Sequence, residues 1–307
     1  MRTRPPEFKV QAMERIEFGN SALRVEAMPE LGGRLSRLQL NADGVWHDAL
    51  VPIGVDPTLP PRWPKGGAYP LVPYSNRIQN ARLRHDGLDY ELVPHPDAIP
   101  HTLHGHAHLR TWHVQAQSAE TLAISYTHVA DAHWPWAFHA TQRFWVEDTR
   151  LGIEIAVVNT DSRRAPAGIG WHPYFPINGD PTIALSAASE WLQNDANVAT
   201  GEVAPGPPHG LALDAQGGTR YLGGWQGHAS FETGTGLRID LHANEPIGHM
   251  VVHRPPSINY LCLEPVSHVA NGFNLAAAGQ RETGTKNLMP GETMTGQLLL
   301  ALAYVRA

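Results

Sequence analysis

Cysteine is almost absent from this sequence. Cys262 is the single cysteine among 307 residues, so no disulfide can form within the chain. The sequence also lacks any run of roughly 18 consecutive apolar residues, which a membrane-spanning helix needs. Its start, MRTRPPEFKV, has no apolar segment typical of a signal peptide. We therefore predict a cytoplasmic protein that is neither secreted nor inserted in a membrane.

Charged residues are also scarce, at 17% of the chain, and the formal net charge is -6. Lys and Arg are scattered rather than clustered, which argues against nucleic acid or another polyanion as a partner. Hydrophobic residues make up 42% of the chain, enough to bury a large core. Because we find no linker, repeat or low-complexity segment, residues 1–307 are predicted to form a single domain. We expect a monomer or homodimer that binds a small molecule.

Motifs that bind nucleotides or activate a serine are missing. The sequence has no GxxxxGK[ST] phosphate loop, no GxGxxG after a strand and no GxSxG elbow. These absences remove the main support for a nucleotide-dependent enzyme or a serine hydrolase, and we expect no cofactor.

Strands are predicted to dominate, because 29 Gly and 26 Pro interrupt almost every window of roughly three helical turns. Four segments alternate apolar and polar residues as half-buried strands do. They are 22–27, 88–93, 151–158 and 237–241. The apolar run 293–305 is predicted to be the last strand, and the Gly- and Pro-rich residues 201–224 are interpreted as a long surface loop. The pattern predicts an all-β fold, one large antiparallel β-sandwich.

Two titratable residues stand directly before prolines at the ends of apolar strands. His172 precedes Pro173, and Glu264 precedes Pro265. A residue before proline is held extended, so both side chains occupy stiffened positions that suit a preorganised catalytic pair. Each residue alone has a plainer interpretation, as a hydrogen-bonded structural histidine or a solvated strand-end acid. Together they indicate acid–base chemistry.

Hydrogen-bond donors and aromatic rings near these positions favour a sugar as the ligand. Asn76 and Arg77 interrupt an apolar segment with the fixed donors that an array of hydroxyls needs, although an ordinary salt bridge would also explain Arg77. Trp171 and Tyr174 flank the His172-Pro173 step and offer flat surfaces to the C–H face of a sugar ring. Most of the tryptophans are nevertheless expected in the core.

Three histidines, His104, His106 and His108, alternate along the chain, so on a strand all three would share one face. Such a run could bind zinc, and a metal-dependent isomerase that loses activity on chelation stays open as an alternative. We favour the interpretation that the run contributes one functional histidine and no metal site. Cys262 lies two residues before Glu264, but its leucine neighbours indicate an inert buried thiol.

Four motifs together resemble one enzyme family in their identity and order. They are Asn76-Arg77-Ile78, Leu103-His104-Gly105, His172-Pro173-Tyr174-Phe175 and Glu264-Pro265. The chain is similar to the aldose 1-epimerases, also called galactose mutarotases, from about the first strand to the last. This resemblance implies a β-sandwich of the supersandwich type. It also implies interconversion of the ring anomers of a reducing sugar without metal or cofactor.

The resemblance further implies a role for individual residues. Glu264 matches the general base, His172 the general acid, and His104 a second histidine at the ring oxygen, while Arg77 matches a residue that binds sugar hydroxyls. A hexose-6-phosphate mutarotase would use the same chemistry with an added phosphate clamp. The candidates for that clamp are Arg62, Lys65, Arg82 and Arg84. A sugar-binding module without turnover is the other alternative.

One element departs from the family pattern. The family usually carries a sugar-binding aspartate in a Leu-Asp-Asp-like segment, whereas residues 220–229 contain no acid and offer Gln226 and His228 instead. A changed or relaxed sugar preference is therefore expected, unless Glu232 or Asp214 reaches the site from a neighbouring loop.

Overall fold

The computed structural model describes residues 14–54 and 64–305, and most of these lie in β-strands. The strands of the first half are β1 (Ile16–Gly19), β2 (Leu23–Met28), β3 (Arg34–Ala42), β4 (Val45–Asp48), β5 (Ala68–Leu71), β6 (Arg77–Ile78), β7 (Arg82–His85), β8 (Leu88–Glu91), β9 (Thr102–Leu103), β10 (His113–Gln117), β11 (Thr121–His128), β12 (Phe138–Glu147) and β13 (Arg150–Asn159). The strands that follow are β14 (Ala165–Ala167), β15 (Gly170–Pro173), β16 (Phe175–Pro176), β17 (Thr182–Gln193), β18 (Ala199–Pro205), β19 (Leu211–Ala212), β20 (Gly218–Glu232), β21 (Leu237–Ala243), β22 (His249–Arg254), β23 (Tyr260–Val266), β24 (Lys286–Leu288) and β25 (Thr293–Tyr304). The helical segments are α1 (Gly272–Ala277) and the 3-10 turns η1 (Gln79–Ala81), η2 (Pro96–Ala98) and η3 (Ala107–Leu109).

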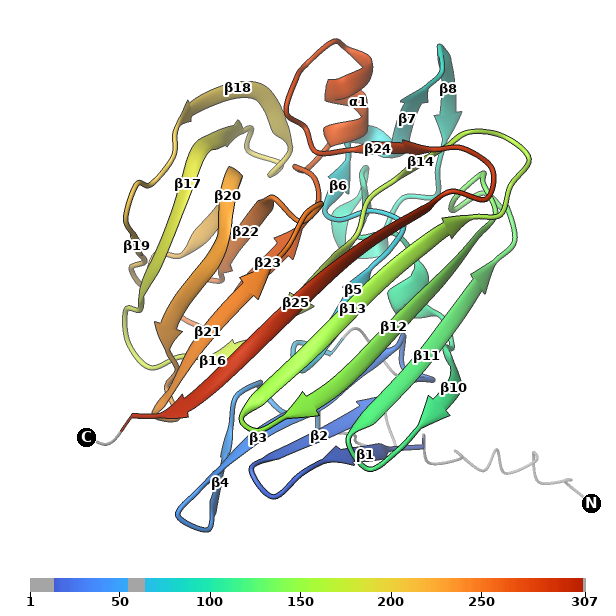
Figure 1. Cartoon of the computed structure of the whole chain (residues 1–307). Helices are drawn as coiled ribbons and strands as arrows, with labels where there is room; N and C mark the ends of the chain where they lie inside the picture. Colours follow the sequence, from blue (N-terminus) through green and yellow to red (C-terminus); the bar gives the residue numbers. More distant parts are fainter. Residues whose placement is uncertain (1–13, 55–63, 306–307) are drawn as a thin grey trace, which may run out of the picture.

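A single antiparallel sheet of 19 strands curls over on itself to form two layers (Figure 1). The front layer of Figure 1 contains β10, β11, β12, β13, β25 and β21, paired in that order. The back layer contains β3, β5, β15, β23, β22 and β20. The long strand β20 joins the layers, because residues 218–223 pair with β22 and residues 228–232 pair with β21. The predicted all-β antiparallel sandwich is confirmed.

Period-2 alternation explains why the predicted segments become strands. In β13, the side chains of Leu151, Ile153, Ile155 and Val157 are buried in the core between the layers. The alternating residues 154, 156 and 158 are partly exposed. The predicted strands 22–27, 237–241 and 293–305 correspond to β2, β21 and β25, while 88–93 contains the shorter β8. Burying one face of each strand fixes its register.

The interpretation of residues 201–224 as a surface loop is wrong in part. This stretch contains most of β18, all of β19 and the start of β20. Glycines in a sequence favour a loop. Here, however, several of them lie at positive φ or against a neighbouring backbone and so permit the strands to pair closely. Gly206, for example, sits where a Cβ atom would lie 2.4 Å from the carbonyl oxygen of Ala187.

The back layer has two chemically different faces. Met250, Val252, Leu261 and Leu263 point into the core between the layers. The residues that alternate with them, together with residues of the adjacent strands, form the other face, which we call the site face. Its members include Tyr69, His172, Tyr221, Val251, Cys262 and Glu264. Most side chains on the site face are buried and several are titratable, an unusual composition for a second core.

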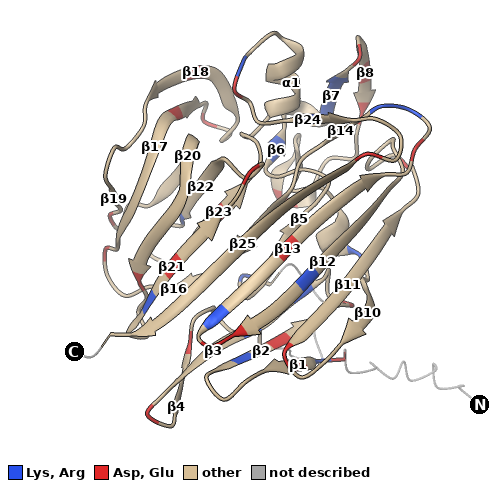
Figure 2. Ribbon diagram, in the orientation of Figure 1, with Lys and Arg blue, Asp and Glu red and all other residues tan. Residues whose placement is uncertain are grey.

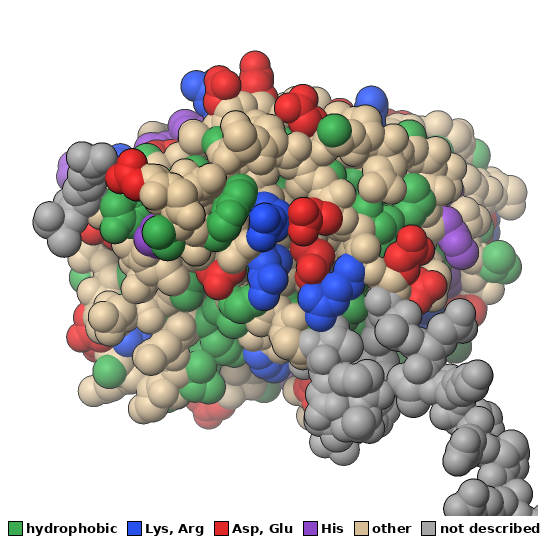
Figure 3. Space-filling view, turned by 90° about the horizontal axis from the view of Figure 1, so that it is seen from below, with side chains coloured by type: hydrophobic (Ala, Val, Ile, Leu, Met, Phe, Trp, Pro, Cys, Tyr) green, Lys and Arg blue, Asp and Glu red, His purple; other side chains and the backbone are tan. Residues whose placement is uncertain are grey.

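Charged side chains are distributed over the whole molecule, as the sequence indicates. Figure 2 shows Lys and Arg interspersed with Asp and Glu along both layers, and Figure 3 shows the two signs side by side on the lower face. Among the described residues, the helices are all too short to traverse a bilayer.

Candidate active site

Glu264 and His172 meet on the site face. Strand β15 pairs with β23 through Gly170 and Val266 and with β5 through His172 and Tyr69. This register places Nε2 of His172 3.2 Å from Oε1 of Glu264. The side chains are 6% and 3% exposed, respectively. The other polar atoms of the pair, Nδ1 of His172 and Oε2 of Glu264, have no hydrogen-bond partner among the described residues.

The proton state of this pair is set by burial. Burial raises the pKa of Glu264 to about 8, and the Arg77 guanidinium opposes this increase. Burial also holds the pKa of His172 well below its ordinary value, with smaller contributions from His253 and Arg34. At neutral pH the pair therefore holds one exchangeable proton, and the two groups titrate as a unit because they are in contact.

His104 approaches the same pair with a defined tautomer. Its Nδ1 accepts a hydrogen bond of 3.0 Å from the backbone N–H of Asn76, so the neutral ring carries its proton on Nε2. The His104 ring meets that of His172 edge-on, with centroids 5.2 Å apart. One ligand atom from each of His104, His172 and Glu264 lies within 4.8 Å of the others. His104 thus brings an N–H donor to the acid–base pair.

Tight backbone turns hold the loops that carry these groups. His104 and Gly105 both have positive φ, 61° and 64°, and a Cβ atom on Gly105 would lie 2.4 Å from the carbonyl oxygen of Val72. Asn76 also has positive φ, 58°, which asparagine tolerates better than most residues. Its side-chain oxygen accepts hydrogen bonds from the N–H of Arg77 at 2.8 Å and the hydroxyl of Tyr221 at 3.2 Å. Asn76 and Arg77 therefore lie at the site, with Asn76 positioning its neighbours.

Two tyrosines cover His172. The rings of Tyr69 and Tyr174 stack against it with centroid distances of 4.5 Å and 4.8 Å. The buried guanidinium of Arg34 lies 4.2 Å from the centroid of the Tyr69 ring, a cation–π contact. Tyr174 was predicted from the sequence, but Tyr69 and Arg34 were missed. Tyr69 lies in an apolar strand that reads as core, and no local signal marks Arg34.

Several predicted site residues lie elsewhere. Trp171 is fully buried in the core between the layers, because adjacent residues of a strand point to opposite faces. It is therefore a core residue, and its prediction as a sugar platform is wrong. The expectation that His104, His106 and His108 share a strand face is also wrong, since His106 and His108 belong to the turn around η3. His108 stacks on Tyr69 at 5.0 Å, whereas His106 joins a different cluster.

The predicted phosphate clamp is not assembled in the described residues. Arg82 and Arg84 are exposed and pair with Glu91 and Asp89 of β8. Arg62 lies outside the described residues. Of the three candidates that the structure describes, Lys65 has an electrostatic influence on site residues, including His253 and Cys262. Burial raises the pKa of the Cys262 thiol well above its ordinary value, as expected for an inert cysteine.

The segment that lacks the family's aspartate forms strand β20. Thr219 and Tyr221 are in register with His253 and Val251 of β22, which places them on the site face. Arg220, between them, makes a two-pronged ion pair with Glu190. The Thr219 hydroxyl and His253 Nδ1 form a hydrogen bond of 2.9 Å. A neutral hydroxyl–imidazole pair is thus a polar feature that β20 brings to this face, in addition to the Tyr221 hydroxyl.

The other residues proposed for that role lie away from the pair of Thr219 and His253. Gln226 is exposed, and His228 contacts Asp240 and His242 of β21. Asp214 is exposed in a turn, where it accepts a hydrogen bond from the N–H of Gln216. Glu232 is exposed at the end of β20 that pairs with β21. In the described residues these acids do not replace the missing aspartate.

Comparison with known proteins finds relatives that share this fold over almost the whole chain. The chain is 27% identical to the uncharacterized protein YphB of Escherichia coli (strain K12) over 282 residues, which cover 86% of this chain and 92% of YphB. Its fold matches a GalM/aldose epimerase homologue from C. elegans with a TM-score of 0.81 at 17% identity, covering 96% of this chain and 100% of that one. A galactose mutarotase-like protein from Clostridium acetobutylicum gives a TM-score of 0.79 at 17% identity, covering 97% and 98%.

The family model for aldose 1-epimerase matches residues 14–301, which is nearly the whole chain and includes all four motifs. The resemblance drawn from those motifs is confirmed: this protein belongs to the aldose 1-epimerase family.

Proposed function

We propose that this protein is a mutarotase that interconverts the α and β anomers of a reducing monosaccharide by general acid–base ring opening. The observation that carries the proposal is the buried 3.2 Å contact between His172 and Glu264. In a cyclic aldose, O1 and the ring oxygen O5 are both bonded to C1. A base for O1 and an acid for O5 must therefore lie close together, as these two groups do.

The reactive form of the pair has a Glu264 carboxylate and a His172 imidazolium, which a proton transfer across their contact generates from the resting form. The carboxylate removes the proton of the O1 hydroxyl while the imidazolium protonates O5. The C1–O5 bond breaks with its electron pair going to O5, and C1 and O1 form a carbonyl. Rotation about C1–C2 and the reverse reaction then give the other anomer, with no net gain or loss of electrons.

The remaining groups would bind and orient the sugar. His104 presents its Nε2–H, which suits a hydrogen bond to the ring oxygen, and Arg77 offers donors for hydroxyls. Tyr174 provides an aromatic ring beside the catalytic pair.

Polarimetry of the purified protein against freshly dissolved aldoses tests the proposal. We expect the approach to rotational equilibrium to accelerate in proportion to protein concentration for at least one sugar. If sugars bind in a calorimeter but none equilibrates faster, the protein is a sugar-binding module instead.

The dependence of activity on pH follows from the shared proton. The active pair must hold one proton, so kcat/KM is expected to be constant near neutrality. It should fall as pH rises through about 8, because Glu264 loses the shared proton there. A second fall is expected in acid, below the ordinary histidine pKa, where His172 takes up another proton. Rates corrected for spontaneous mutarotation measure this profile. A rise through pH 8 to a plateau would show instead that the carboxylate acts without the shared proton.

The neutral Thr219–His253 pair is expected to relax the preference among sugar epimers. A buried carboxylate penalises a sugar that leaves it unpaired, and charge-assisted hydrogen bonds contribute about 1.5–3 kcal/mol against about 0.5–1.5 for neutral ones. We therefore expect discrimination between epimers to be about tenfold weaker than with an acid in place. Comparing kcat/KM for galactose, glucose, arabinose and xylose measures it.

The variant Thr219→Asp, which sets a carboxylate beside His253, is expected to sharpen that discrimination. The matched control is Thr182→Asp, at an exposed position of β17, which should leave the discrimination between epimers unchanged. A steep preference of the unmodified protein for galactose alone would overturn the relaxed-specificity prediction.

A further inference from the structure

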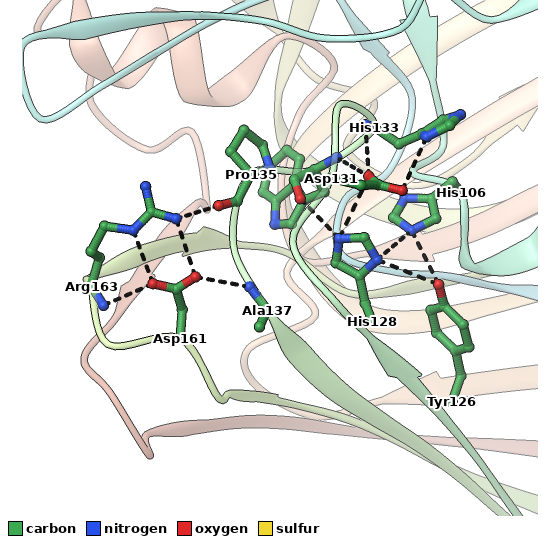
Figure 4. Close-up of polar contacts among 10 residues, drawn as sticks. His106, Tyr126, His128, Asp131, His133, Pro135, Ala137, Asp161 and Arg163 are labelled. Carbon is green, nitrogen blue, oxygen red and sulfur yellow. Dashed lines mark hydrogen bonds and ion pairs between the residues drawn. The ribbon is translucent and has the colours of Figure 1, made fainter.

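A second cluster of metal-binding side chains lies outside the catalytic pair. Tyr126 and His128 alternate on β11 and so share a face, and His106 reaches them from the turn before η3 (Figure 4). Asp131 and His133 follow in the loop after β11. One ligand atom from each of His106, His128 and Asp131 lies within 4.8 Å of the others. We propose that this cluster binds a divalent transition-metal ion of the zinc class.

Three polar atoms of the cluster form a triangle whose sides are close to the spacing of zinc ligands. Nε2 of His106 lies 3.0 Å from Nδ1 of His128, and the Tyr126 hydroxyl oxygen lies 3.2 Å and 3.5 Å from those two nitrogens. Zinc bonds of about 2.0–2.2 Å to nitrogen and oxygen in a tetrahedral arrangement place neighbouring ligand atoms roughly 3.3 Å apart. An ion just above the plane of the triangle would therefore reach all three atoms with little movement of the side chains.

The second nitrogen of His128 fixes its orientation. Nε2 lies 2.8 Å from the carbonyl oxygen of Trp134, so it carries the proton and leaves the Nδ1 lone pair facing His106. A histidine that donates one N–H to a backbone carbonyl and offers its other nitrogen to an ion is the usual arrangement around bound metals. Asp131 lies on the Nε2 side of the same ring, at 3.8 Å, and adds negative charge.

Hydrogen bonds alone do not satisfy every polar atom of this cluster. In the neutral cluster, His106 has one N–H and Tyr126 one O–H, so two protons are available for three short contacts. Two of these contacts compete for the single lone pair of His128 Nδ1. Nδ1 of His106 has no hydrogen-bond partner among the described residues, although the residue is only 4% exposed. An ion would replace the shared protons and allow His106 to take its Nδ1–H tautomer. That tautomer has its lone pair on Nε2, toward the ion.

The imidazoles are in the form that metals require. Burial and the neighbouring His128 lower the pKa of His106 to about 3, and burial lowers that of His128 as well. Both rings are therefore neutral at physiological pH. Burial raises the pKa of the Tyr126 phenol, opposed by the Arg110 guanidinium, which hydrogen-bonds to it, so this oxygen is protonated in the metal-free cluster.

The cluster connects to the candidate active site through the backbone. His106 is two residues from His104, and an ion at His106 and His128 would tie the segment around η3 to β11. Its role would be structural, to restrain the loop that carries His104. The proposed ring opening takes no step at this ion, and the metal site does not depend on the sugar chemistry being right.

Titration with Co²⁺ as a spectroscopic probe tests the site. Protein stripped with EDTA and exchanged into metal-free buffer is expected to bind one Co²⁺ with the intense visible absorption of a tetrahedral complex, and Zn²⁺ should displace it. His128→Gln is expected to weaken binding at least about tenfold. Tyr126→Phe, which removes one oxygen and keeps the ring, is expected to weaken it less, and serves if the histidine variant does not fold.

Two variants act as controls. His139→Gln alters a histidine of the neighbouring strand β12 that bonds Thr127 on the opposite face of β11, and it should leave the spectrum unchanged. Glu264→Gln alters the other group of potential ligands and should also leave it unchanged. No tetrahedral spectrum, a spectrum that survives both His128→Gln and Tyr126→Phe, or one lost with Glu264→Gln would overturn the proposal.

Discussion

Replacing Glu264 with glutamine is expected to lower kcat/KM for anomer interconversion by at least about a hundredfold. Glutamine keeps the shape of the side chain and its contact with His172, but it cannot accept the O1 proton. Because sugar binding relies on other donors such as Arg77, affinity for the sugar should change much less than turnover. Polarimetry measures the rate and calorimetry the affinity.

The thermal stability of Glu264→Gln shows whether a loss of activity comes from the missing base or from unfolding. The folded-state pKa of Glu264 is raised from its ordinary value of 4.5 to about 8. The folded protein therefore keeps a proton that the unfolded chain releases, and the stability from this group is full below about pH 4.5 and is lost as pH rises through about 8. Glutamine does not titrate and so avoids this loss. At pH 8 the melting temperature of Glu264→Gln should therefore be no lower than that of the unmodified protein, and its free energy of unfolding should be higher by an amount on the order of a few kcal/mol.

Glu91→Gln on β8 is the matched control, because this exposed glutamate lies in the separate two-stranded sheet of β7 and β8 and should affect neither rate nor melting. A Glu264→Gln variant that turns over sugar at nearly the normal rate would show that the base is another group.

Replacing His172 with glutamine is expected to reduce kcat by about a hundred- to ten-thousandfold with a smaller effect on KM. His172 is the group assigned to protonate O5, and glutamine cannot carry a proton into the transition state. His104→Gln is expected to cost only about tenfold, because His104 donates a hydrogen bond rather than a proton, and one such bond contributes about 0.5–1.5 kcal/mol. Initial rates over a range of sugar concentrations separate kcat from KM.

His139→Gln, on the outer surface of the same sheet, controls for the loss of a histidine as such. If His104→Gln proves more damaging to kcat than His172→Gln, the roles of the two histidines are reversed.

The fold was predictable because it depends on local and repeated features. Alternation in segments such as 151–158 and 237–241 needs only the sequence, and burying one face of each strand follows from it. The pairing of His172 with Glu264 was also predictable, since both stand before prolines at the ends of apolar strands. Residues 201–224 were not, because glycines that signal loops in isolation can also allow close strand pairing.

Sequence reasoning misassigned or missed residues whose place depends on which strands pair and to which face of the sheet each side chain points. Trp171 adjoins His172, yet the strand sends it to the opposite face. Tyr69 looks like core and becomes part of the site because β5 pairs with β15. Thr219 and His253, 34 residues apart, meet only through the pairing of β20 with β22. Pairing partners of this kind leave no mark in a single sequence.

Exchange between the two anomers of an aldose at equilibrium tests the acid–base pair most directly, because it requires ring opening and closing and nothing else. Magnetisation-exchange NMR on the sugar that polarimetry identifies as the best substrate measures this rate without any net reaction. The unmodified protein should accelerate exchange strongly, and Glu264→Gln and His172→Gln should each reduce the acceleration by at least about a hundredfold. Exchange that stays equally fast in both variants would contradict the assignment of ring opening to Glu264 and His172.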